Sequence, residues 1–600
     1  MSVAPREELS RWNLSPYFDG PDDPRVEAEL GAVRAEAQDF LAAYQGRIAS
    51  LRADQLREAL ERYDAIGGRL SDLADFGFLT YCLDTRDERA QALNTRMGGE
   101  TAMVRMDTAF LHHELQDLAE EAFQALCEAE ALAPWRETLS RLRRRAPHAL
   151  EDAVERAITR KEQSGIQAWR QLYTTLTSSR IIRMPSPQGA YTVSVAEANR
   201  LMTSPNRATR RAATEASIQS IVDRTDVITA VFNAVLEDVR VNAELRGFSL
   251  PYGETLIDED LDASAVEAML SAVESRYDLV HRYMGLKARA LGIEDFSAWD
   301  INAPMAAEPP QYSFSEARRI VHDAYTGFHP RVGQLIDRFF TDGYIDAAPA
   351  PNKWAGAFCS WSTPGRHPYL LISYTNRIRD LLTLAHELGH GVHYAMTGAF
   401  DRYMNLRISM FSETPSTFGE LLAFERLVAE APSHDVRRTL LGAWLDTTVG
   451  TLFLQVAMTR WEQQIHAARH EGPLAAETFR TLWMQERRRL FGPEVELPEW
   501  VSQGWLVHQH AVNMPFYSMS YPFGLMMVYG LRQRYREEGS QFAEAFVGQL
   551  LEGGLSPAVA TLLKRIDVDM HDVGFWHKGL NAVEALIDEF EATLDQAPEA

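Results

Sequence analysis

Apolar residues recur at helical spacing along most of this 600-residue chain. Between residues 23 and 180 they return every three or four positions, which predicts a series of amphipathic helices. Helical patterning resumes at Asn206, and Ser313 with Glu316 forms the capping-box signature of a helix start. Beyond Ser412 the pattern is helical almost to the end. The predicted N-terminal helices cover residues 30–44, 56–79, 90–122 and 149–176. The chain is therefore expected to be mainly α-helical.

Two segments have the alternation or the apolar run of a strand. Residues 191–195 alternate after the turn formers Pro185, Pro187 and Gly189, and this first change of pattern is the candidate domain boundary. It divides an N-terminal helical domain, residues 1–190, from a second domain, residues 191–600. Residues 367–374 form the best strand, and Pro368 near its start suits an edge strand.

Composition excludes several classes of protein. Hydrophobic residues make up 46% of the chain and charged residues 24%, as in globular proteins. The net charge of -24 disfavours nucleic acid and acidic membrane surfaces as partners. No apolar run approaches 18 residues, so no membrane span is expected. Three distant cysteines and no visible signal peptide fit a reducing compartment, which predicts a cytoplasmic location.

The most informative motif is His386-Glu387-Leu388-Gly389-His390, in a segment of helical pattern from residue 380 to 397. Residues four apart on a helix share one face, so both imidazoles can bind a single metal ion. Glu387 lies one position further round the helix, where it can contact a metal-activated water. The motif predicts a Zn²⁺ site with Glu387 as general base.

The third ligand is not fixed by the motif itself. His393 is too far along the helix for all three rings to converge on one ion, which leaves it a packing or substrate-side role. Met396 stands where the three-histidine class carries its third ligand. The remaining option is a carboxylate from a later segment. The candidates are Asp401, Glu413, Glu420 and Glu425, with Glu420 also placed to support a histidine.

Gly389 and Gly391 within the motif helix each cost about 1 kcal/mol of helix stability. Such a cost is accepted where a second helix must come close, so both glycines predict a tightly packed neighbour. A second sequence, His113-Glu114-Leu115-Gln116-Asp117, nearly repeats the metal motif but ends in Asp. No matching acidic segment follows it, and it is interpreted as surface.

Four segments resemble the thimet oligopeptidase and oligoendopeptidase F metallopeptidases, closest to the oligoendopeptidase F branch. They are the zinc helix around His386, the segment Ser412 to Glu420, Gly356-Ala357-Phe358-Cys359, and the aromatic segment from His510 to Gly524. The resemblance implies two helical lobes around a deep substrate groove, with a small β-sheet beside the zinc helix. It also implies one Zn²⁺ per chain, held by His386, His390 and Glu413.

The resemblance further implies a function and the residues that serve it. The function is hydrolysis of internal bonds in short peptides, with Tyr521, Tyr517 and His510 as donors to the developing oxyanion. Gly356 and Ala357 would let a substrate backbone come close, and residues 368–373 are the strand expected to pair with an extended peptide. Two alternatives stay open: a zinc exopeptidase of a related fold, and an inactive peptide-binding protein.

Overall fold

The protein is described here by a computed structural model that places residues 9–187, 189–307, 309–361, 366–397, 404, 410–554 and 557–595. Its contacts divide the chain into two compact units, each assembled from three stretches of sequence. Unit 1 is Met1–Pro147, Pro310–Leu427 and Arg534–Val568, and unit 2 is His148–Pro309, Val428–Gln533 and Asp569–Ala600. The domain boundary near residue 190 stays a prediction about the sequence, as does the groove between lobes.

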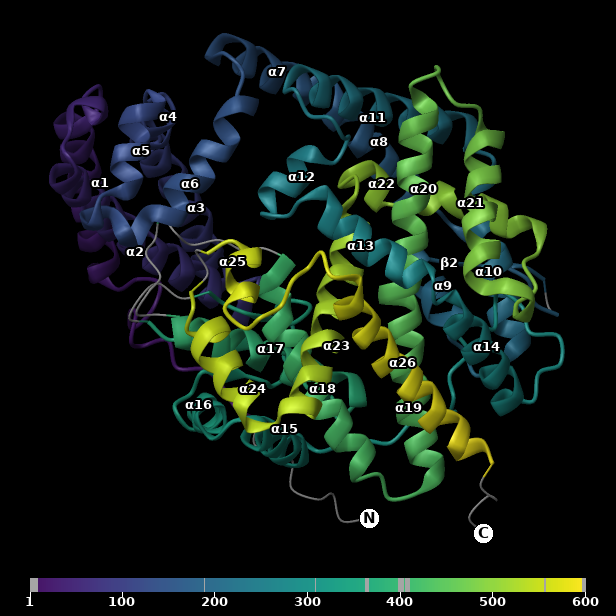
Figure 1. Ribbon diagram of the computed structural model, residues 1–600. Helices are drawn as coiled ribbons and strands as arrows, with labels where there is room; N and C mark the ends of the chain where they lie inside the picture. Colours follow the sequence, from purple (N-terminus) through teal and green to yellow (C-terminus); the bar gives the residue numbers. More distant parts are fainter. Residues whose placement is uncertain are drawn as a thin grey trace. The chain divides into compact units, whose positions relative to one another are not determined.

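Unit 1 is helical with one small sheet, as its sequence pattern predicts (Figure 1). Leu30, Val33 and Phe40 form the buried stripe of its first helix, with at most 1% of each side chain exposed. The capping box at Ser313 is present at the start of α15. Its helices are α1 Pro24–Tyr44, α2 Ala53–Leu83, α3 Glu88–Thr108, α4 Phe110–Gln116, α5 Glu120–Glu128, α6 Arg136–Arg145, α15 Phe314–Phe328, α16 Pro330–Thr341, α17 Ile378–Thr397, α18 Glu413–Ala429, α24 Ser540–Ala545 and α25 Val559–Lys564.

The sheet of unit 1 corrects one sequence prediction. Its order is β3 (Ile345–Asp346), β5 (Leu370–Leu371), β4 (Phe358–Cys359), with β5 parallel to β3 and antiparallel to β4. The strand predicted over residues 367–374 is thus short and central, so residues 368–373 are not an edge that a peptide could pair with. Its continuous apolar run is the pattern of a strand covered on both faces. The edge next to it is β4.

Unit 2 is also helical and contains one hairpin, β1 Ile182–Met184 with β2 Tyr191–Val193, which confirms a strand at the predicted position. Its core is aromatic, with Trp461 and Trp505 fully buried around Phe232. Its helices are α7 Asp152–Ser164, α8 Ile166–Ser178, α9 Val195–Met202, α10 Arg207–Val222, α11 Thr225–Leu245, α12 Gly253–Asp258, α13 Ala263–Glu274, α14 Tyr277–Leu291, α19 His434–Thr448, α20 Leu454–Arg469, α21 Ala476–Phe491, α22 His510–Asn513, most of α23 Ser520–Glu538, and α26 Val573–Leu594.

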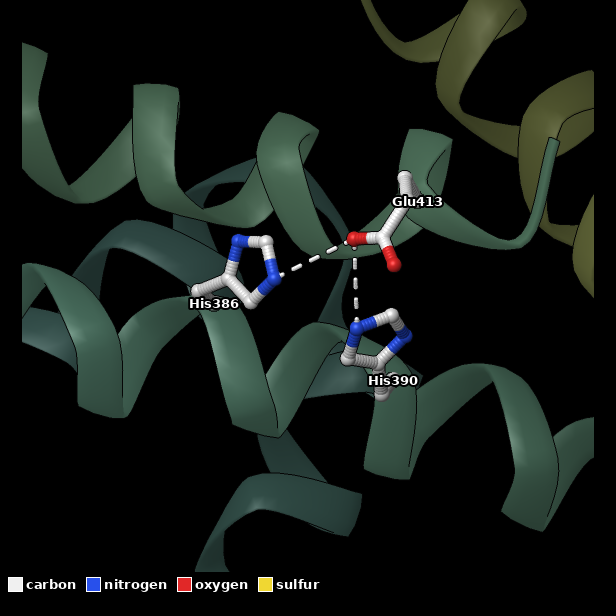
Figure 2. A group of neighbouring side chains, drawn as sticks. All are labelled: His386, His390 and Glu413. Carbon is white, nitrogen blue, oxygen red and sulfur yellow. Dashed lines mark ion pairs between the residues drawn. The ribbon is translucent and has the colours of Figure 1, made fainter. Parts of the chain in front are cut away.

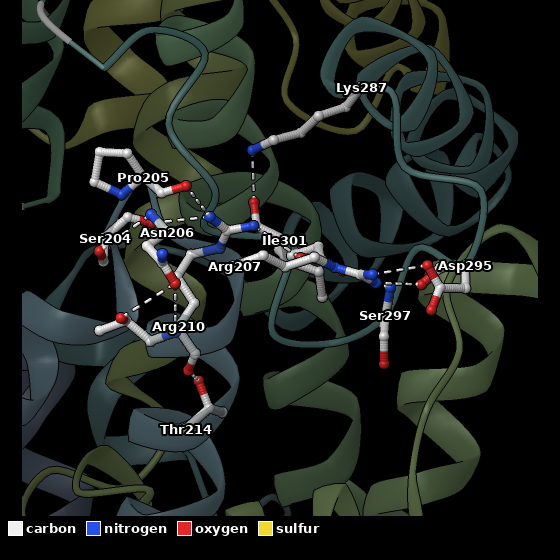
Figure 3. Close-up of polar contacts among 12 residues, drawn as sticks. Ser204, Pro205, Asn206, Arg207, Arg210, Thr214, Lys287, Asp295, Ser297 and Ile301 are labelled. Atoms are coloured by element: carbon white, nitrogen blue, oxygen red, sulfur yellow. Dashed lines mark hydrogen bonds and ion pairs between the residues drawn. The ribbon is translucent and has the colours of Figure 1, made fainter. Parts of the chain in front are cut away.

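A buried charge network holds the start of α10 in unit 2 (Figure 3). Asp300 is fully buried and accepts hydrogen bonds from Arg207 at 2.8 Å and from Arg210 at 2.8 Å. Arg210 also donates to the Ser204 and Pro205 carbonyls, at 2.8 and 3.0 Å. Each buried charge therefore has a partner, which offsets the cost of removing it from water.

One helical run of unit 2, His434–Arg469, is long and apolar enough to cross a membrane by length and composition alone. However, 61% of its most apolar window is buried inside the protein. A helix at the centre of a helical domain has the same composition, so this run is weak evidence for a membrane span.

Candidate metal centre

His386, His390 and Glu413 come together in unit 1 (Figure 2). The two histidines project from the same face of α17, and Glu413 is the first residue of α18. One Glu413 oxygen, Oε2, lies 3.3 Å from Nε2 of His386 and 3.5 Å from Nε2 of His390. The potential ligand atoms all lie within 4.8 Å of one another, and no other such group occurs among the described residues.

This spacing fits a tetrahedral zinc ion. Zinc–ligand bonds of about 2.0–2.2 Å at tetrahedral angles place neighbouring ligand atoms about 3.3 Å apart. The carboxylate–imidazole separations of 3.3 and 3.5 Å match that edge length. The carboxylates around His386 also favour a positive charge at this site. Burial alone would lower the pKa of His386, but hydrogen bonds with Glu413 and Glu420 outweigh it and raise the pKa to about 10.

The four acidic candidates have different surroundings. Glu413 faces both histidines, and its side chain is 54% exposed. Glu420, two turns along α18, places Oε2 3.2 Å from Nδ1 of His386, on the ring edge away from Glu413. Glu425 instead pairs with Arg536 at 2.8 Å. Asp401 lies outside the described residues.

Close helix approach explains the glycines of the motif. A Cβ on Gly389 would lie 2.5 Å from Cα of Ser416 in α18, so only glycine admits this neighbour, as predicted. Gly391 instead contacts Phe339 of α16, where a Cβ would lie 2.4 Å from the ring. Tyr325 of α15 fills the gap between α17 and α18, and its hydroxyl donates to the Ala385 carbonyl at 2.7 Å. These contacts fix the position of Glu413 relative to the histidines.

Glu387 is withdrawn from water beside the metal group. Only 7% of the residue is exposed. Burial raises the pKa of its carboxyl above the ordinary value, against the lowering effect of His386 and His390. A backbone hydrogen bond from Cys359 in β4 also reaches Glu387. The sheet therefore orients the carboxylate, and a carboxylate with a raised pKa is suited to take and return a proton.

Three other predicted site residues, Gly356, Ala357 and His393, also belong to unit 1. Gly356 and Ala357 immediately precede β4, and the φ of +111° at Gly356 is one that L side chains rarely adopt. His393 is fully buried, and burial lowers its pKa to about 3. This burial favours the packing role over the substrate-side role that the sequence also allowed.

The three predicted oxyanion donors belong to unit 2 and form their own cluster. Tyr521 Oη lies 3.5 Å from Nε2 of His510, and the rings of Tyr517 and Tyr521 meet edge to face at 5.4 Å. The tyrosines are 41% and 36% exposed. Burial lowers the pKa of His510, which favours the neutral imidazole.

Sequence reasoning missed residues that hold these groups in place. Glu462 in α20 is fully buried and accepts a hydrogen bond from the Phe516 backbone N–H at 2.6 Å. Phe516 has a φ of +63°, so this bond fixes a strained residue directly before Tyr517. Glu462 is the single acid of α20, which was the available signal. In unit 1, Tyr394 stacks on His390 with ring centroids 5.8 Å apart.

The chain is similar to known proteins over most of its length. The sequence model of Peptidase family M3 matches residues 200–582, and that of Oligopeptidase F matches residues 114–180. Oligopeptidase PepF of Bacillus subtilis is 23% identical over 98% of this chain and 87% of its own length. The plasmid-encoded oligoendopeptidase F of Lactococcus lactis is 21% identical over 98% of both chains.

Solved structures show the same fold. One from Chlamydophila abortus has a TM-score of 0.88 at 22% identity and covers 99% of this chain and 100% of its own. Oligoendopeptidase-F from Enterococcus faecium has a TM-score of 0.68 at 18% identity, with coverage of 96% and 99%. The chain therefore belongs to Peptidase family M3, a family of metallopeptidases, in its oligopeptidase F branch.

Proposed function

We propose that this protein is a zinc-dependent oligoendopeptidase that hydrolyses internal bonds of short peptides. The observation that carries the proposal is the convergence of His386, His390 and Glu413 within 4.8 Å, with the buried Glu387 on the same helix. Family membership supports peptides as the substrate class. The names of the relatives, oligopeptidase and oligoendopeptidase, support a preference for short chains and internal bonds.

The three grouped residues would hold the zinc ion, and Glu420 would orient His386 through Nδ1. When bound, zinc makes a water molecule acidic enough to attack at neutral pH and polarises the peptide carbonyl. Glu387 takes the proton from the attacking water and later delivers it to the leaving amine. Its buried position on the helix of the two histidines suits both transfers, because the carboxyl must hold the proton between them.

Two further contributions come from the polypeptide. The edge strand β4 offers backbone groups to an extended peptide, which would give binding that tolerates many sequences. Tyr521 is our first choice for a donor to the developing oxyanion, with Tyr517 and His510 as the other candidates. These three assignments rest on the family resemblance and on the partial exposure of the two tyrosines.

Peptides blocked at one or both ends distinguish the three possible functions. An oligoendopeptidase cleaves a peptide of about ten residues that is acetylated at its N-terminus and amidated at its C-terminus. A zinc exopeptidase requires a free terminus and leaves that substrate intact. A peptide-binding protein without activity binds all the peptides and cleaves none. Mass spectrometry of the products identifies the outcome and the cleaved bond.

Replacement of Glu413 tests the ligand set independently of turnover. Glu413→Ala removes the carboxylate oxygen that, among the described residues, faces both imidazoles, so the variant should lose zinc during dialysis against a mild chelator. Zinc per chain is measured by mass spectrometry of the metal, with Glu425→Ala in the same helix as control. Full zinc retention in Glu413→Ala would contradict this ligand assignment.

A further inference from the structure

A cavity of about 670 Å³ lies within unit 2. Its wall comes from the end of α8, the start of α9, the middle of α10 and the segment from Trp500 to Gln509. We call it the Arg180 cavity, because Arg180 is the one charged residue of its described lining. The metal ligands belong to unit 1, and the proposed function gives this cavity no role. Its size is typical of sites that hold small organic molecules, and the question is what it binds.

Arg180 is buried and held in one orientation. Only 7% of the residue is exposed. Its Nε donates to the Thr177 carbonyl at 2.8 Å, and its Nη1 donates to the Ser217 carbonyl at 2.9 Å and to the Ser220 hydroxyl at 3.2 Å. A guanidinium has five N–H groups, and the two on Nη2 donate to no described residue. The side chain is therefore fixed in place with two donors left for a ligand.

The positive charge of Arg180 has no carboxylate partner among the described residues. Burial lowers the pKa of its guanidinium, Arg224 lowers it further and Tyr173 raises it, with no contribution from Asp or Glu. Arg210 in the same unit is also buried, but it pairs with Asp300 at 2.8 Å. A buried charge is costly unless it is paired, and arginine does not lose its proton to escape that cost. An anion in the cavity would supply the missing partner.

The start of α9 adds backbone donors to the same cavity. Ser194 caps the helix, and the next two residues, Val195 and Ala196, line the cavity with it. N–H groups in the first turn of a helix have no partner within the helix, and the helix dipole favours an anion there. The antiparallel pairing of β1 with β2 brings this turn to Arg180, which lies two residues before β1, while α9 begins two residues after β2.

The remainder of the wall offers apolar contact area. It is lined by Met202, Ile218, Trp500 and Val507. An inorganic ion would leave these side chains uncovered, whereas an organic ligand would remove part of their apolar surface from water. A ligand that fits the whole cavity therefore combines an anionic group with an apolar body.

We propose that the Arg180 cavity binds a small organic anion, with a carboxylate or phosphate group on an apolar body. The anionic group would accept hydrogen bonds from Nη2 of Arg180 and from the N–H groups at the start of α9. The apolar body would pack on Trp500 and its neighbours. All of these groups belong to unit 2, so the inference does not depend on the proposed peptidase function.

Titration calorimetry on the full-length, zinc-loaded protein tests the site with benzoate, phenyl phosphate and the neutral benzyl alcohol. At least one of the two aromatic anions should bind about 10-fold or more tightly than benzyl alcohol, because hydrogen bonds between charged groups are the strong ones. The tighter of the two identifies the anionic group as carboxylate or phosphate. Acetate and inorganic phosphate, which lack the ring, should bind more weakly than the aromatic anions.

Two variants locate the bound anion. Arg180→Gln should weaken its binding about 10-fold or more, with Arg180→Lys intermediate. The control with the same change of charge is Arg200→Gln, because Arg200 is exposed on α9 and pairs with Glu197. Ala196→Phe fills the cavity, leaves the hydrogen bonds of Arg180 in place and should also weaken binding. Its control is Ala208→Phe, which has the same position in the first turn of α10 but lies outside the cavity lining.

Failure of both aromatic anions to bind the wild-type protein would overturn the site, as would equal affinity for benzyl alcohol. Binding that is equally tight in Arg180→Gln and in wild type would also overturn it, because the anion would then be held elsewhere, such as at the zinc. If Arg180→Gln does not fold, the comparison of Ala196→Phe with Ala208→Phe decides. Equal affinities of those two variants for the aromatic anion would contradict the inference.

Discussion

Each histidine of the metal group has a different set of neighbours, and that difference matters for metal affinity. Glu420 accepts from Nδ1 of His386 at 3.2 Å, which fixes the ring and leaves Nε2 towards Glu413. His390 has no partner for its Nδ1 among the described residues and is held by stacking on Tyr394. Carboxylates that orient a ligating histidine raise its basicity and affinity for metal. We therefore expect Glu420 to raise the affinity for zinc although it is not itself a ligand.

Glu420→Gln tests this role. The amide keeps the size of the side chain but loses the charge, so zinc affinity should fall roughly 10- to 100-fold with little change in thermal stability. Competition with a chromophoric zinc chelator measures the affinity. Glu425→Gln, one turn further along α18 and paired with Arg536, is the matched control. Equal zinc affinity in the two variants would show that Glu420 does not support His386.

At the scale of elements, the metal centre depends on how closely α17 and α18 approach. Glycine at 389 and 419 makes room for the neighbouring helix and for Tyr325, whose hydroxyl occupies the space between them. A Cβ on Gly419 would lie 1.6 Å from that hydroxyl oxygen. The buried site has no free volume to absorb a methyl group, so substitution must move the tyrosine or separate the helices.

Gly419→Ala should therefore destabilise unit 1 by about 1–3 kcal/mol or more and weaken zinc binding at the same time. Gly31→Ala is the control, because Gly31 is an exposed glycine inside α1 with nothing within 4 Å of a Cβ. That change should stabilise the helix by up to about 1 kcal/mol. Thermal unfolding followed by circular dichroism compares the two, and equal melting temperatures would contradict the close-packing argument.

At the scale of the whole molecule, local features were predictable and long-range ones were not. The helical periodicity, the capping box at Ser313 and the helix carrying His386 depend on neighbours within one or two turns. The place of β5 depends on strands that are distant in sequence, and a short apolar run does not reveal a central position. The units interleave three stretches each, which no composition change marks. Cys359 and Tyr325 support the metal centre through contacts that spacing alone cannot reveal.

Stability should also depend on pH through Asp75 of α2. Burial, helped by Asp72, raises the pKa of the Asp75 carboxyl to about 8. In the unfolded chain the same carboxyl releases its proton near pH 3.9, as exposed aspartates do. Between these values the folded state binds more protons, so the stability present below about pH 4 is progressively lost as pH rises towards 8.

Asp75→Asn removes this proton uptake, because an amide stays neutral at all these pH values. The variant should show a smaller fall in the free energy of unfolding between pH 5 and pH 8, with its largest gain over wild type at pH 8. Urea unfolding at several pH values measures this difference. An unchanged pH slope would mean that Asp75 ionises normally in the folded protein.

The central claim is that Glu387 moves the proton during zinc-dependent peptide hydrolysis. The most direct test compares wild type and Glu387→Gln, each with one measured zinc per chain, on the same doubly blocked quenched peptide. The account predicts unchanged zinc content and a loss of kcat of roughly 10²- to 10⁴-fold, the usual contribution of a general base. Near wild-type turnover by zinc-loaded Glu387→Gln would contradict it.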